Sequence, residues 1–256
     1  MRSDAFGVAL QARRTRVSDQ ILRVQSLSAA YGKHQVLTSI DLSLDRGEWF
    51  SLVGPNGSGK STLIHCVVGQ LAPASGNVRV DGSDIYAAPQ IAKRRLGYAH
   101  PPERLPGLLT GRQCLEIYAA AREQAEFEAE IIQLAQSFRL DGLLDQFVDT
   151  YSLGTRQKLS ILLALMGDPA LVVLDEAFNG LDPRSGHILK RHLQERVGAR
   201  RCAVFLATHS LDIVLRYSTR VALLQDGQFQ RSWNAGELRA MRMGNPDALE
   251  VALAQA

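Results

Sequence analysis

A nine-residue segment rich in glycine constrains the fold of this chain more than any other feature. It lies between a short apolar run at 49–53 and an apolar segment at 63–68. A strand buried on both faces has such a continuous apolar sequence, and glycines allow the chain to turn sharply from it into a helix. The segment therefore predicts a buried strand, a tight loop and a helix in a domain of the α/β class. Its members are Gly54, Pro55, Asn56, Gly57, Ser58, Gly59, Lys60, Ser61 and Thr62.

The composition of this loop also suits the binding of phosphate groups. Its glycines let backbone N–H groups point toward one centre, and the dipole of the following helix favours an anion there. Lys60 is placed to contact the outer phosphates of a nucleotide, and the Ser61 hydroxyl is a ligand for Mg²⁺. A glycine-rich turn with a lysine by chance is the alternative, but the flanking strand and helix favour the phosphate-binding motif.

A second buried strand, predicted at 171–174, ends in two adjacent carboxylates, Asp175 and Glu176. Ligands of open α/β sheets bind at the carboxyl ends of the strands. There, Asp175 would hold Mg²⁺ through its water shell, and Glu176 would orient or deprotonate an attacking water. Such a pair on its own is more often a solvated strand end, but the loop at 54–62 favours the functional interpretation.

The rest of the chain alternates strand-like and helical patterns. Residues 76–82 have the turn residues of a hairpin, and residues 113–139 have apolar side chains at a helical period behind a proline-containing loop. Strands separated by helices predict a parallel sheet with helices on both faces, in which the helical stretch is an insertion. The further strands are predicted at 21–24, 36–44, 203–206 and 221–224.

A third motif, Tyr-Ser-Leu-Gly-Thr-Arg-Gln at 151–157, selects among the classes of protein that use a phosphate loop. It resembles the signature of the ATP-binding subunits of ABC transporters, which usually reads Leu-Ser-Gly-Gly-Gln followed by a basic residue and Gln. Ser152 and Gly154 match this signature, whereas Leu153 replaces the first glycine and Thr155 replaces the final glutamine. In the family, the serine begins a helix and faces the γ-phosphate of ATP on the partner subunit.

Further motifs support the resemblance because they follow the family's order over residues 21–230. Tyr31 lies where the family has an aromatic residue that stacks on adenine. Asn-Gly-Leu-Asp at 179–182 matches the loop that contacts the other subunit, and His209 matches the switch histidine that touches the γ-phosphate. Taken alone, Tyr31 or His209 is explained equally well by core packing.

One position departs from the family pattern. The family usually has a glutamine between the first core segment and the helical insertion, where it binds Mg²⁺ and relays the nucleotide state to the membrane partner. Alignment of Leu-Gly-Tyr at 96–98 and Leu-Thr at 109–110 without gaps places Pro101 there. Proline has neither a donor nor a side-chain oxygen. His100 and Glu103 are polar neighbours, but neither is in register.

The resemblance implies an ABC-type P-loop ATPase with a mainly parallel core sheet, an antiparallel β portion near the N-terminus and a helical insertion. We therefore expect a basic arm at 1–20, an ATPase domain at 21–230 and a C-terminal helical tail at 231–256. The helical subdomain at 93–165 would be inserted in the ATPase domain.

The resemblance also implies the ATPase reaction, with ATP and Mg²⁺ as cofactors. Two such subunits, expected as a homodimer, would sandwich two ATP molecules, and separate membrane-spanning permease subunits would convert the motion into transport. The Tyr-Ser-x-Gly spelling and the length of a single core are most similar to the ATPases of simple exporters or permease-type pumps. The implied catalytic residues are Glu176 and His209, the implied nucleotide contacts are Tyr31, residues 54–62, Ser152, Gly154 and Asp175, and the implied Mg²⁺ ligands are Ser61 and Asp175.

The composition limits where the protein acts. The longest apolar run, at 161–166, is far shorter than a bilayer span of about 20 residues, and no apolar segment typical of a signal peptide follows Met1. Cys66, Cys114 and Cys202 are scattered and odd in number, which favours a reduced compartment over a disulfide framework. We expect a cytoplasmic protein, peripheral on the cytoplasmic face of the cell membrane and held there by its partners.

The net charge of +3 comes from the first 16 residues, which hold four arginines and one aspartate. The remaining chain carries 25 basic and 25 acidic side chains (29 − 4 and 26 − 1), so no basic groove for nucleic acid is indicated. The arm either attracts anionic lipid headgroups, at roughly 1 kcal/mol per basic residue, or is a poorly ordered, solvated terminus.

Two alternative functions stay open at this point. A soluble ABC ATPase of ribosomes or DNA repair would have two cores or a long coiled coil, and 256 residues hold one core without such an insertion. A regulatory module that holds ATP without hydrolysing it is disfavoured by Glu176 and His209. Pro101 and the altered signature keep that module open.

Overall fold

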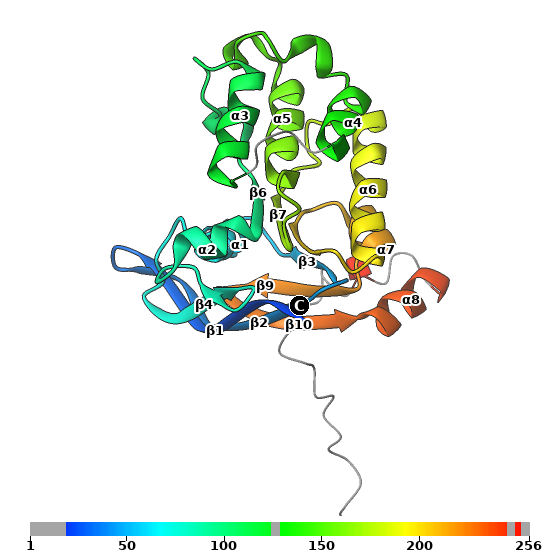
Figure 1. The fold of residues 1–256 in the computed structure, drawn as a ribbon. Helices are drawn as coiled ribbons and strands as arrows, with labels where there is room; N and C mark the ends of the chain where they lie inside the picture. The colour runs from blue at the N-terminus through cyan, green and yellow to red at the C-terminus, as the bar shows by residue number, and fades with distance from the viewer. Residues whose placement is uncertain (1–18, 124–128, 245–248, 252–256) are drawn as a thin grey trace, which may run out of the picture.

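The centre of the molecule is a six-stranded sheet in a computed structural model that describes residues 19–123, 129–244 and 249–251 (Figure 1). The strand order is β10-β9-β3-β8-β7-β6. Neighbouring strands are parallel except β9 and β10, which confirms the predicted mainly parallel core. The basic arm lies outside the described residues up to residue 18. The strands are β3 (Trp49–Val53), β6 (Leu96–Ala99), β7 (Leu171–Asp175), β8 (Ala203–Ala207), β9 (Arg220–Gln225) and β10 (Gln228–Asn234).

Both faces of the central strands are buried, which explains their continuous apolar sequences. In β7, Val172 and Leu174 join a hydrophobic cluster on one face, and Leu171 and Val173 join a second cluster on the other. Successive side chains of a strand point to opposite faces, so one short run supplies both clusters. The two layers of packing fix the sheet and hold its carboxyl edge in place.

A smaller antiparallel sheet, in the order β2-β1-β4-β5, covers one side of the core. Leu63 and Ile64 of α1 lie in the same hydrophobic cluster as the inward side chains of this sheet. The hairpin predicted at 76–82 is confirmed, because β4 and β5 pair across a turn at Asp81 and Gly82. The strands are β1 (Gln20–Tyr31), β2 (His34–Asp45), β4 (Ser75–Val80) and β5 (Ser83–Asp84).

The helices lie on both sides of the core sheet, and α3, α4 and α5 form a group that projects from it (Figure 1). The described residues contain no helix that is long and apolar enough to cross a membrane. The α-helices are α1 (Lys60–Val67), α2 (Pro89–Arg94), α3 (Gly111–Ala121), α4 (Ala129–Ser137), α5 (Leu153–Leu165), α6 (Pro183–Gly198), α7 (Leu211–Tyr217) and α8 (Ala235–Gly244). The 3₁₀ helices are η1 (Pro102–Arg104), η2 (Asp141–Leu143) and η3 (Val148–Thr150).

The helical period at 113–139 corresponds to two helices, α3 and α4, with residues 124–128 outside the described part. Helix α3 ends at Ala121, and Glu123 takes a left-handed backbone with φ 58° that an α-helix does not allow. The range 93–165 also includes β6, a strand of the core sheet. Only the part after β6 therefore projects from the core.

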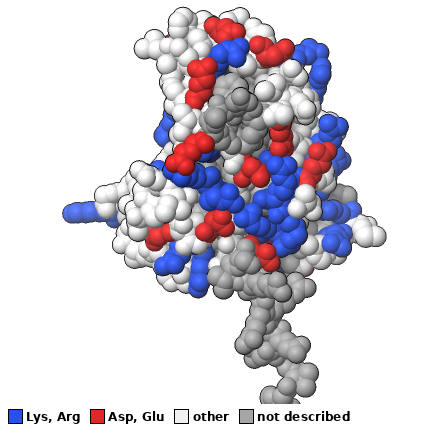
Figure 2. Space-filling view, viewed as in Figure 1, with Lys and Arg blue, Asp and Glu red and all other residues white. Residues whose placement is uncertain are grey.

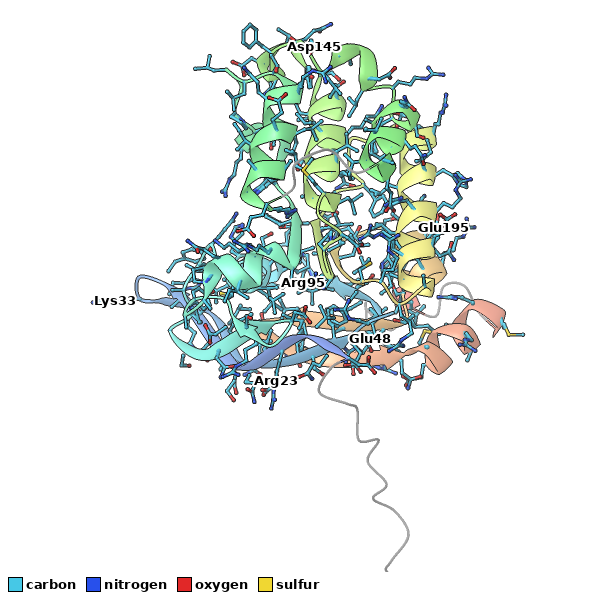
Figure 3. The ribbon with its side chains drawn as sticks, viewed as in Figure 1. Arg23, Lys33, Glu48, Arg95, Asp145 and Glu195 are labelled. Atoms are coloured by element: carbon cyan, nitrogen blue, oxygen red, sulfur yellow. The ribbon has the colours of Figure 1, made fainter. Side chains whose placement is uncertain are left out.

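Charged side chains connect the projecting helices to the core. Glu130 of α4 lies 3.4 Å from Arg196 of α6 and 3.1 Å from Arg201, and Asp168 lies 3.0 Å from Arg201 and also pairs with Arg196. Arg196 is only 3% exposed. On the surface, Figure 2 shows basic side chains gathered across the middle of the molecule with carboxylates among them, in the area where Figure 3 labels Arg95. The ion pairs of Glu130 and Asp168 with Arg196 and Arg201 restrain the projecting helices against the core.

The C-terminal part begins with a strand and continues with a helix. Strand β10 pairs with β9 and runs across residue 230, where the sequence placed the start of a helical tail. Alternating polar residues obscured this strand in the sequence, because it is an edge strand with one exposed face. Trp233 of β10 and Leu238 of α8 pack in one cluster with Leu249. The sheet therefore continues to Asn234.

Candidate nucleotide-binding site

The glycine-rich loop has a backbone that only glycine permits at two positions. A Cβ at Gly54 would lie 2.1 Å from the carbonyl oxygen of Leu224 in β9, so the loop could not enter the sheet edge with a side chain there. Gly59 has a φ of +105° and directly precedes α1, and a Cβ on it would lie 2.7 Å from Leu37. The close approach of the backbone at Gly54 and the positive φ of Gly59 let the loop turn sharply from β3 into α1.

Lys60 folds back over the loop. Its Nζ donates to the carbonyl oxygens of Gly54 at 2.9 Å and Pro55 at 3.0 Å. Burial lowers the pKa of Lys60, and the negative charges of Glu176 and Asp175 oppose that effect. The Ser58 hydroxyl is buried and has no hydrogen-bond partner among the described residues. A cation and an unpaired donor at a helix start are a donor set that fits phosphate oxygens.

The two carboxylates lie at the carboxyl end of β7. Glu176 has a left-handed backbone with φ 48°, and its N–H donates to the carbonyl oxygen of Ala207 at the end of β8. Its Oε1 lies 3.5 Å from Nε2 of His209, and its Oε2 accepts a hydrogen bond of 3.1 Å from the Asn179 side chain. The fold thus brings His209, after β8, next to Glu176 and Asn179, which lie in one loop between β7 and α6. Such a group can orient a water molecule and receive its proton.

The protein supplies few ligands for a divalent cation. The part of the chain that the structure describes has no group of three His, Cys, Asp or Glu side chains that could hold a metal ion. Ser61 is exposed at the start of α1, and Asp175 is half-buried at the sheet edge. A hydroxyl and a nearby carboxylate fit Mg²⁺, which keeps several waters and is held in part by substrate phosphates.

The signature residues form the start of α5. The Ser152 hydroxyl caps this helix by accepting from the N–H of Thr155 at 3.2 Å. A Cβ on Gly154 would lie 2.8 Å from the carbonyl oxygen of Gly180, so the signature and the loop at 179–182 are packed against each other. No hydrogen bond or ion pair of the described residues joins residues 151–157 to the phosphate loop.

An ion pair that the sequence did not reveal joins the same two segments. Lys158 Nζ lies 2.7 Å from Oδ2 of Asp182, and Oδ1 of Asp182 caps α6 by accepting from the N–H of Ser185. The hydrogen bond from Lys158 lowers the pKa of Asp182, and hydrogen bonds from Ser185 lower it further. The two residues are 24 positions apart (182 − 158), so only a bend of the chain between helices brings them together.

Tyr31 ends β1 with 51% of its surface exposed. The neighbouring strand β2 reaches the loop, since a Cβ on Gly59 would lie 3.3 Å from Val36. An exposed ring at the end of the strand that pairs with β2 is suited to stacking on a base.

Pro101 lies between β6 and η1, and its carbonyl oxygen accepts from the N–H of Arg104. Burial lowers the pKa of the adjacent His100, and the charges of Arg104 and Lys93 lower it further. The Tyr98 hydroxyl in β6 is buried without a partner among the described residues, and burial raises its pKa to about 12. Sequence reasoning missed Tyr98 because an aromatic residue in a buried strand reads as core.

A strand that enters a glycine-rich loop and a helix, with a Glu–His pair at the edge of the same parallel sheet, defines a nucleotide-binding domain of the P-loop class. A family model described as "ABC transporter" matches residues 37–179, more than half of the chain. The chain belongs to this family of ABC ATPases. ABC ATPases bind ATP, and this chain is homologous to the ATP-binding subunits of transporters.

Individual relatives agree with this assignment. The "Uncharacterized ABC transporter ATP-binding protein YdbJ" of Bacillus subtilis is 34% identical over 84% of this chain and 69% of its own length. The "Nod factor export ATP-binding protein I" of Rhizobium meliloti is 31% identical over 80% of this chain and 61% of its own length. A solved "ATP binding subunit of ABC transporter" has 31% identity and a TM-score of 0.82, covering 91% of this chain and 99% of that one. Among these and other curated relatives, the share of the relative's own length that the chain spans runs from 8% to 69%.

Proposed function

We propose that this protein hydrolyses ATP to power transport through separate membrane-spanning permease subunits. The observation that carries the proposal is the placement of Lys60 and the Glu176–His209 pair at one sheet edge, where their charges interact. Residues 54–62 would hold the phosphates, and Tyr31 would stack on the adenine. When bound, Mg²⁺ would supply positive charge at the outer phosphates, with Ser61 as a ligand and Asp175 acting through water.

The hydrolytic step would use the negative charge of Glu176. Its carboxylate would orient the attacking water and accept its proton, while His209 would contact the γ-phosphate. The N–H of Glu176 bonded to Ala207 and the Asn179 amide on Oε2 hold this carboxylate at the end of β7. The charge of Lys60 would stabilise the outer phosphates as negative charge develops on the leaving group.

A second copy of the chain would complete each site. No hydrogen bond or ion pair joins Ser152 or Gly154 to the phosphate loop within the described part of one chain, and Ser152 is exposed. In a head-to-tail dimer, the start of α5 would face the γ-phosphate bound by the other copy, where its N-terminal dipole favours an anion. The loop at 179–182 packs against Gly154 and would lie in the same interface.

The membrane partners and the direction of transport belong to the same proposal. The name of the Rhizobium relative includes export, and the Tyr-Ser-x-Gly signature and single core support an exporter-like subunit. The protein would act at the cytoplasmic face of the cell membrane through its permease partners. A regulatory module that binds ATP without turnover is the second candidate, favoured by Pro101 in place of glutamine and by Thr155 in the signature.

Phosphate release from the purified chain separates these two functions. We expect MgATP-dependent release that is lost in Lys60→Ala, because the substitution removes the cation from the outer phosphates. Lys33→Ala, at the tip of the β1–β2 hairpin (Figure 3), is a matched control that should keep normal turnover. Undiminished turnover in Lys60→Ala would refute the phosphate-loop assignment, and absent turnover in the parent chain with retained ATP binding would favour the regulatory module. Permease subunits that co-purify in mild detergent would identify the membrane partner.

A further inference from the structure

Two hydroxyl groups near the carboxyl edge of the core sheet, those of Ser58 and Tyr98, are buried without a hydrogen-bond partner among the described residues. Ser58 belongs to the phosphate loop, where its hydroxyl would meet a phosphate oxygen. Tyr98 is only 6% exposed, and the proposed ATPase mechanism uses no contact of its hydroxyl. A buried tyrosine hydroxyl usually has a hydrogen-bond partner, since a buried polar group without one is destabilising. The Tyr98 hydroxyl is therefore a donor that the nucleotide-bound state could use.

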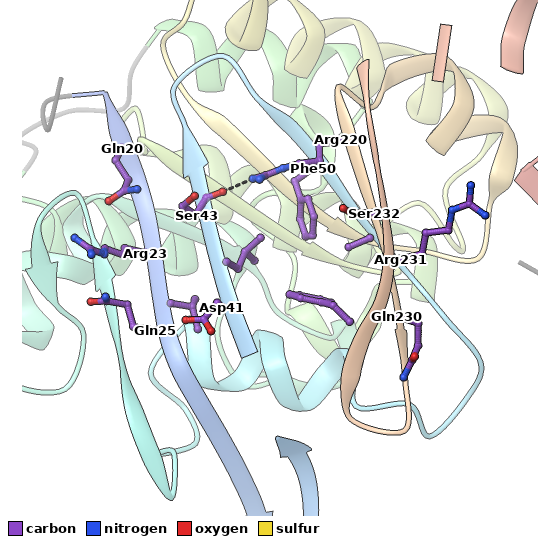
Figure 4. Close-up of a pocket in the computed structure, with 14 residues that line it drawn as sticks. Gln20, Arg23, Gln25, Asp41, Ser43, Phe50, Arg220, Gln230, Arg231 and Ser232 are labelled. Atoms are coloured by element: carbon purple, nitrogen blue, oxygen red, sulfur yellow. Dashed lines mark hydrogen bonds between the residues drawn. The ribbon is translucent and has the colours of Figure 1, made fainter. Parts of the chain in front are cut away.

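Arg220, in the groove of about 800 Å³ between β2 and the β9–β10 pair, is the opposite case (Figure 4). Its guanidinium donates to the carbonyl oxygen of Ser43, as the dashed line in Figure 4 marks, and lies 3.1 Å from Glu48. The charge of Arg220 is thus matched within the chain, and this groove gives no sign of a ligand. Tyr98 differs because its hydroxyl has no such partner.

The strand register places Tyr98 on the same face of the sheet as Asp175. Tyr98 pairs with Val173 in the parallel ladder of β6 and β7, and Asp175 follows Val173 by two residues. Side chains two positions apart on a strand point to the same face, so Tyr98 and Asp175 are diagonal neighbours, roughly 8 Å apart between Cα atoms. An aromatic side chain can reach a diagonal neighbour at this separation. Tyr98 is therefore placed beside the carboxylate that would hold Mg²⁺ through water.

Helix α1 packs on the face that Tyr98 and Asp175 share. Tyr98 lies in one hydrophobic cluster with Leu63 and Ile64 of this helix, whose first turn contains Ser61. Burial raises the pKa of Tyr98, and the negative charge of Asp175 raises it further, which agrees with the closeness of the phenol and the carboxylate. Tyr98 therefore lies on the side of the sheet from which α1 supplies the other expected Mg²⁺ ligand.

The surroundings of the Tyr98 hydroxyl select its partner. The ring lies edge-on to the ring of His100, with centroids 4.7 Å apart, and the carbonyl oxygen of His100 accepts from the Ser160 hydroxyl of α5 at 2.7 Å. Two charged side chains, Asp175 and Arg104, act on the phenol. A guanidinium only donates, whereas an ionised carboxylate only accepts. Of these two groups, only Asp175 can receive a hydrogen bond from the hydroxyl.

We propose that Tyr98 is a positioning residue that performs the task of the glutamine that Pro101 replaces. Its hydroxyl donates to the Asp175 carboxylate when MgATP is bound, and it thereby fixes the oxygen that holds the water shell of Mg²⁺. Groups that hydrogen-bond a carboxylate at a metal site orient it and strengthen metal binding. This inference rests on the proposed function, since it requires the nucleotide to bind at the phosphate loop.

Binding of a non-hydrolysable ATP analogue to the full chain, measured by calorimetry with Mg²⁺ and again with EDTA, tests the proposal without turnover. Mg²⁺ should strengthen binding to the parent chain. Tyr98→Phe removes the hydroxyl and keeps the ring, so we expect the affinity with Mg²⁺ to fall at least fivefold and the affinity with EDTA to change less than twofold. Tyr118→Phe, which removes a tyrosine hydroxyl from α3 in the projecting part, should change neither affinity.

Two further variants separate positioning from packing. Pro101→Gln supplies a side-chain oxygen, so adding Tyr98→Phe to Pro101→Gln should lower the affinity with Mg²⁺ less than twofold. Tyr98→Phe should also keep the urea unfolding midpoint of the parent chain, because the hydroxyl has no hydrogen bond to lose. Tyr86→Phe should lower that midpoint, since the Tyr86 hydroxyl donates to the carbonyl oxygens of Cys66 and Leu71, each at 2.6 Å.

The opposite results would overturn the proposal. An equal loss of affinity with Mg²⁺ and with EDTA would assign Tyr98 to packing alone, and an unchanged affinity would leave the hydroxyl without a role. A loss with Mg²⁺ that persists in full beside Pro101→Gln would show that Tyr98 does not replace the glutamine. A parent chain that fails to bind the analogue in either condition would refute the proposed nucleotide site, and this inference with it. ATP turnover is not part of these readouts, so failure of the proposed ATPase activity would leave them valid.

Discussion

At the scale of single residues, the candidate site depends on positions where the backbone leaves no choice of side chain. Gly54 touches the carbonyl oxygen of Leu224, so the entry of the loop is set by a strand about 170 residues later in the chain (224 − 54). The phosphate loop buries the Lys60 side chain, and this burial lowers the pKa of Lys60. The nearby carboxylates of Glu176 and Asp175 favour the charged form of the lysine. A lysine in this balance can exchange its bonds to Gly54 and Pro55 for phosphate oxygens.

Pro101 gives the first prediction at this scale. Two prolines in succession stiffen the turn after β6, and Pro101 has no side-chain oxygen for Mg²⁺. Because Ser61, phosphate oxygens and water can complete six ligands, we expect Pro101→Gln to raise basal turnover modestly. The affinity for MgATP should stay within about tenfold, or ~1.4 kcal/mol. Titration of nucleotide binding beside phosphate release measures both, and a much larger gain in affinity would contradict the prediction.

At the scale of elements, helix α5 carries the signature at one end and packs on the core sheet at the other. A Cβ on Gly97 in β6 would lie 1.8 Å from the carbonyl oxygen of Ala164, so the absence of a side chain allows the helix to approach the strand. The start of the same helix touches the loop at 179–182 through Gly154 and Lys158. The placement of the signature is therefore a property of how α5 packs.

Gly97→Ala should destabilise the fold because the new methyl group overlaps backbone. We expect a loss of about 1–3 kcal/mol in the free energy of unfolding, the usual cost of overpacking a core. Gly198→Ala is the matched control, since nothing lies within 4 Å of a Cβ at the end of α6. Urea unfolding of both variants measures the difference. If Gly97→Ala and Gly198→Ala were equally stable, helix α5 would be able to move away from β6 and accommodate the methyl group at little cost.

The ion pair between Lys158 and Asp182 gives a prediction that depends on pH. The folded state lowers the pKa of Asp182 below its ordinary 3.8, so its stabilising contribution is present above that value and is lost as pH falls toward the folded-state pKa. Lys158→Met should cost less than about 1 kcal/mol at pH 7, because Asp182 is half-exposed.

A pH series of urea unfolding checks this ion pair. The difference between Lys158→Met and the parent chain should shrink as the pH falls below about 4. Arg191→Met breaks a pair in which both side chains are about 70% exposed, and it should change stability by much less at every pH. A Lys158→Met effect that is constant from pH 7 to pH 3 would indicate lost packing and not a lost ion pair.

At the scale of the whole molecule, the two groups of residues that would contact one ATP in the proposed dimer lie on separate surfaces of each chain. The phosphate loop and Glu176 lie at the edge of the core sheet, whereas Ser152 begins a helix of the projecting part (Figure 1). The network of Glu130, Arg196 and Arg201 restrains the projecting helices against the core. When ATP binds, two copies would therefore come together so that the phosphate loop of each copy faces Ser152 of the other.

Glu176→Gln tests this arrangement. The amide keeps the shape of the side chain but cannot accept a proton from water, so we expect ATP to bind and turnover to collapse. Unhydrolysed ATP should then hold two copies together, which a sizing column detects as a shift from monomer to dimer. Glu195→Gln, an exposed position on α6 (Figure 3), should neither dimerise more nor lose turnover. A Glu176→Gln chain that stays monomeric with ATP and hydrolyses it normally would remove Glu176 from the catalytic role.

The sequence alone was sufficient for the elements whose physical demands are local. The loop at 54–62 follows from the backbone freedom of glycine, and the central strands follow from short apolar runs that two buried faces require. The parallel core and the antiparallel portion were predicted correctly from these patterns and the family resemblance. Strand β10 was missed because an exposed edge strand has polar residues on one face, and its pairing with β9 depends on a distant partner.

The tertiary structure decided which distant side chains meet. The contact of Glu176 with His209 and the Lys158–Asp182 pair both join segments that no local pattern connects. Their formation depends on strand order, because parallel strands collect the ends of separate segments at one edge of a sheet. Local sequence thus determined the loop, the strands and the class of chemistry, and the order of the strands with the packing of the helices determined which distant charges meet.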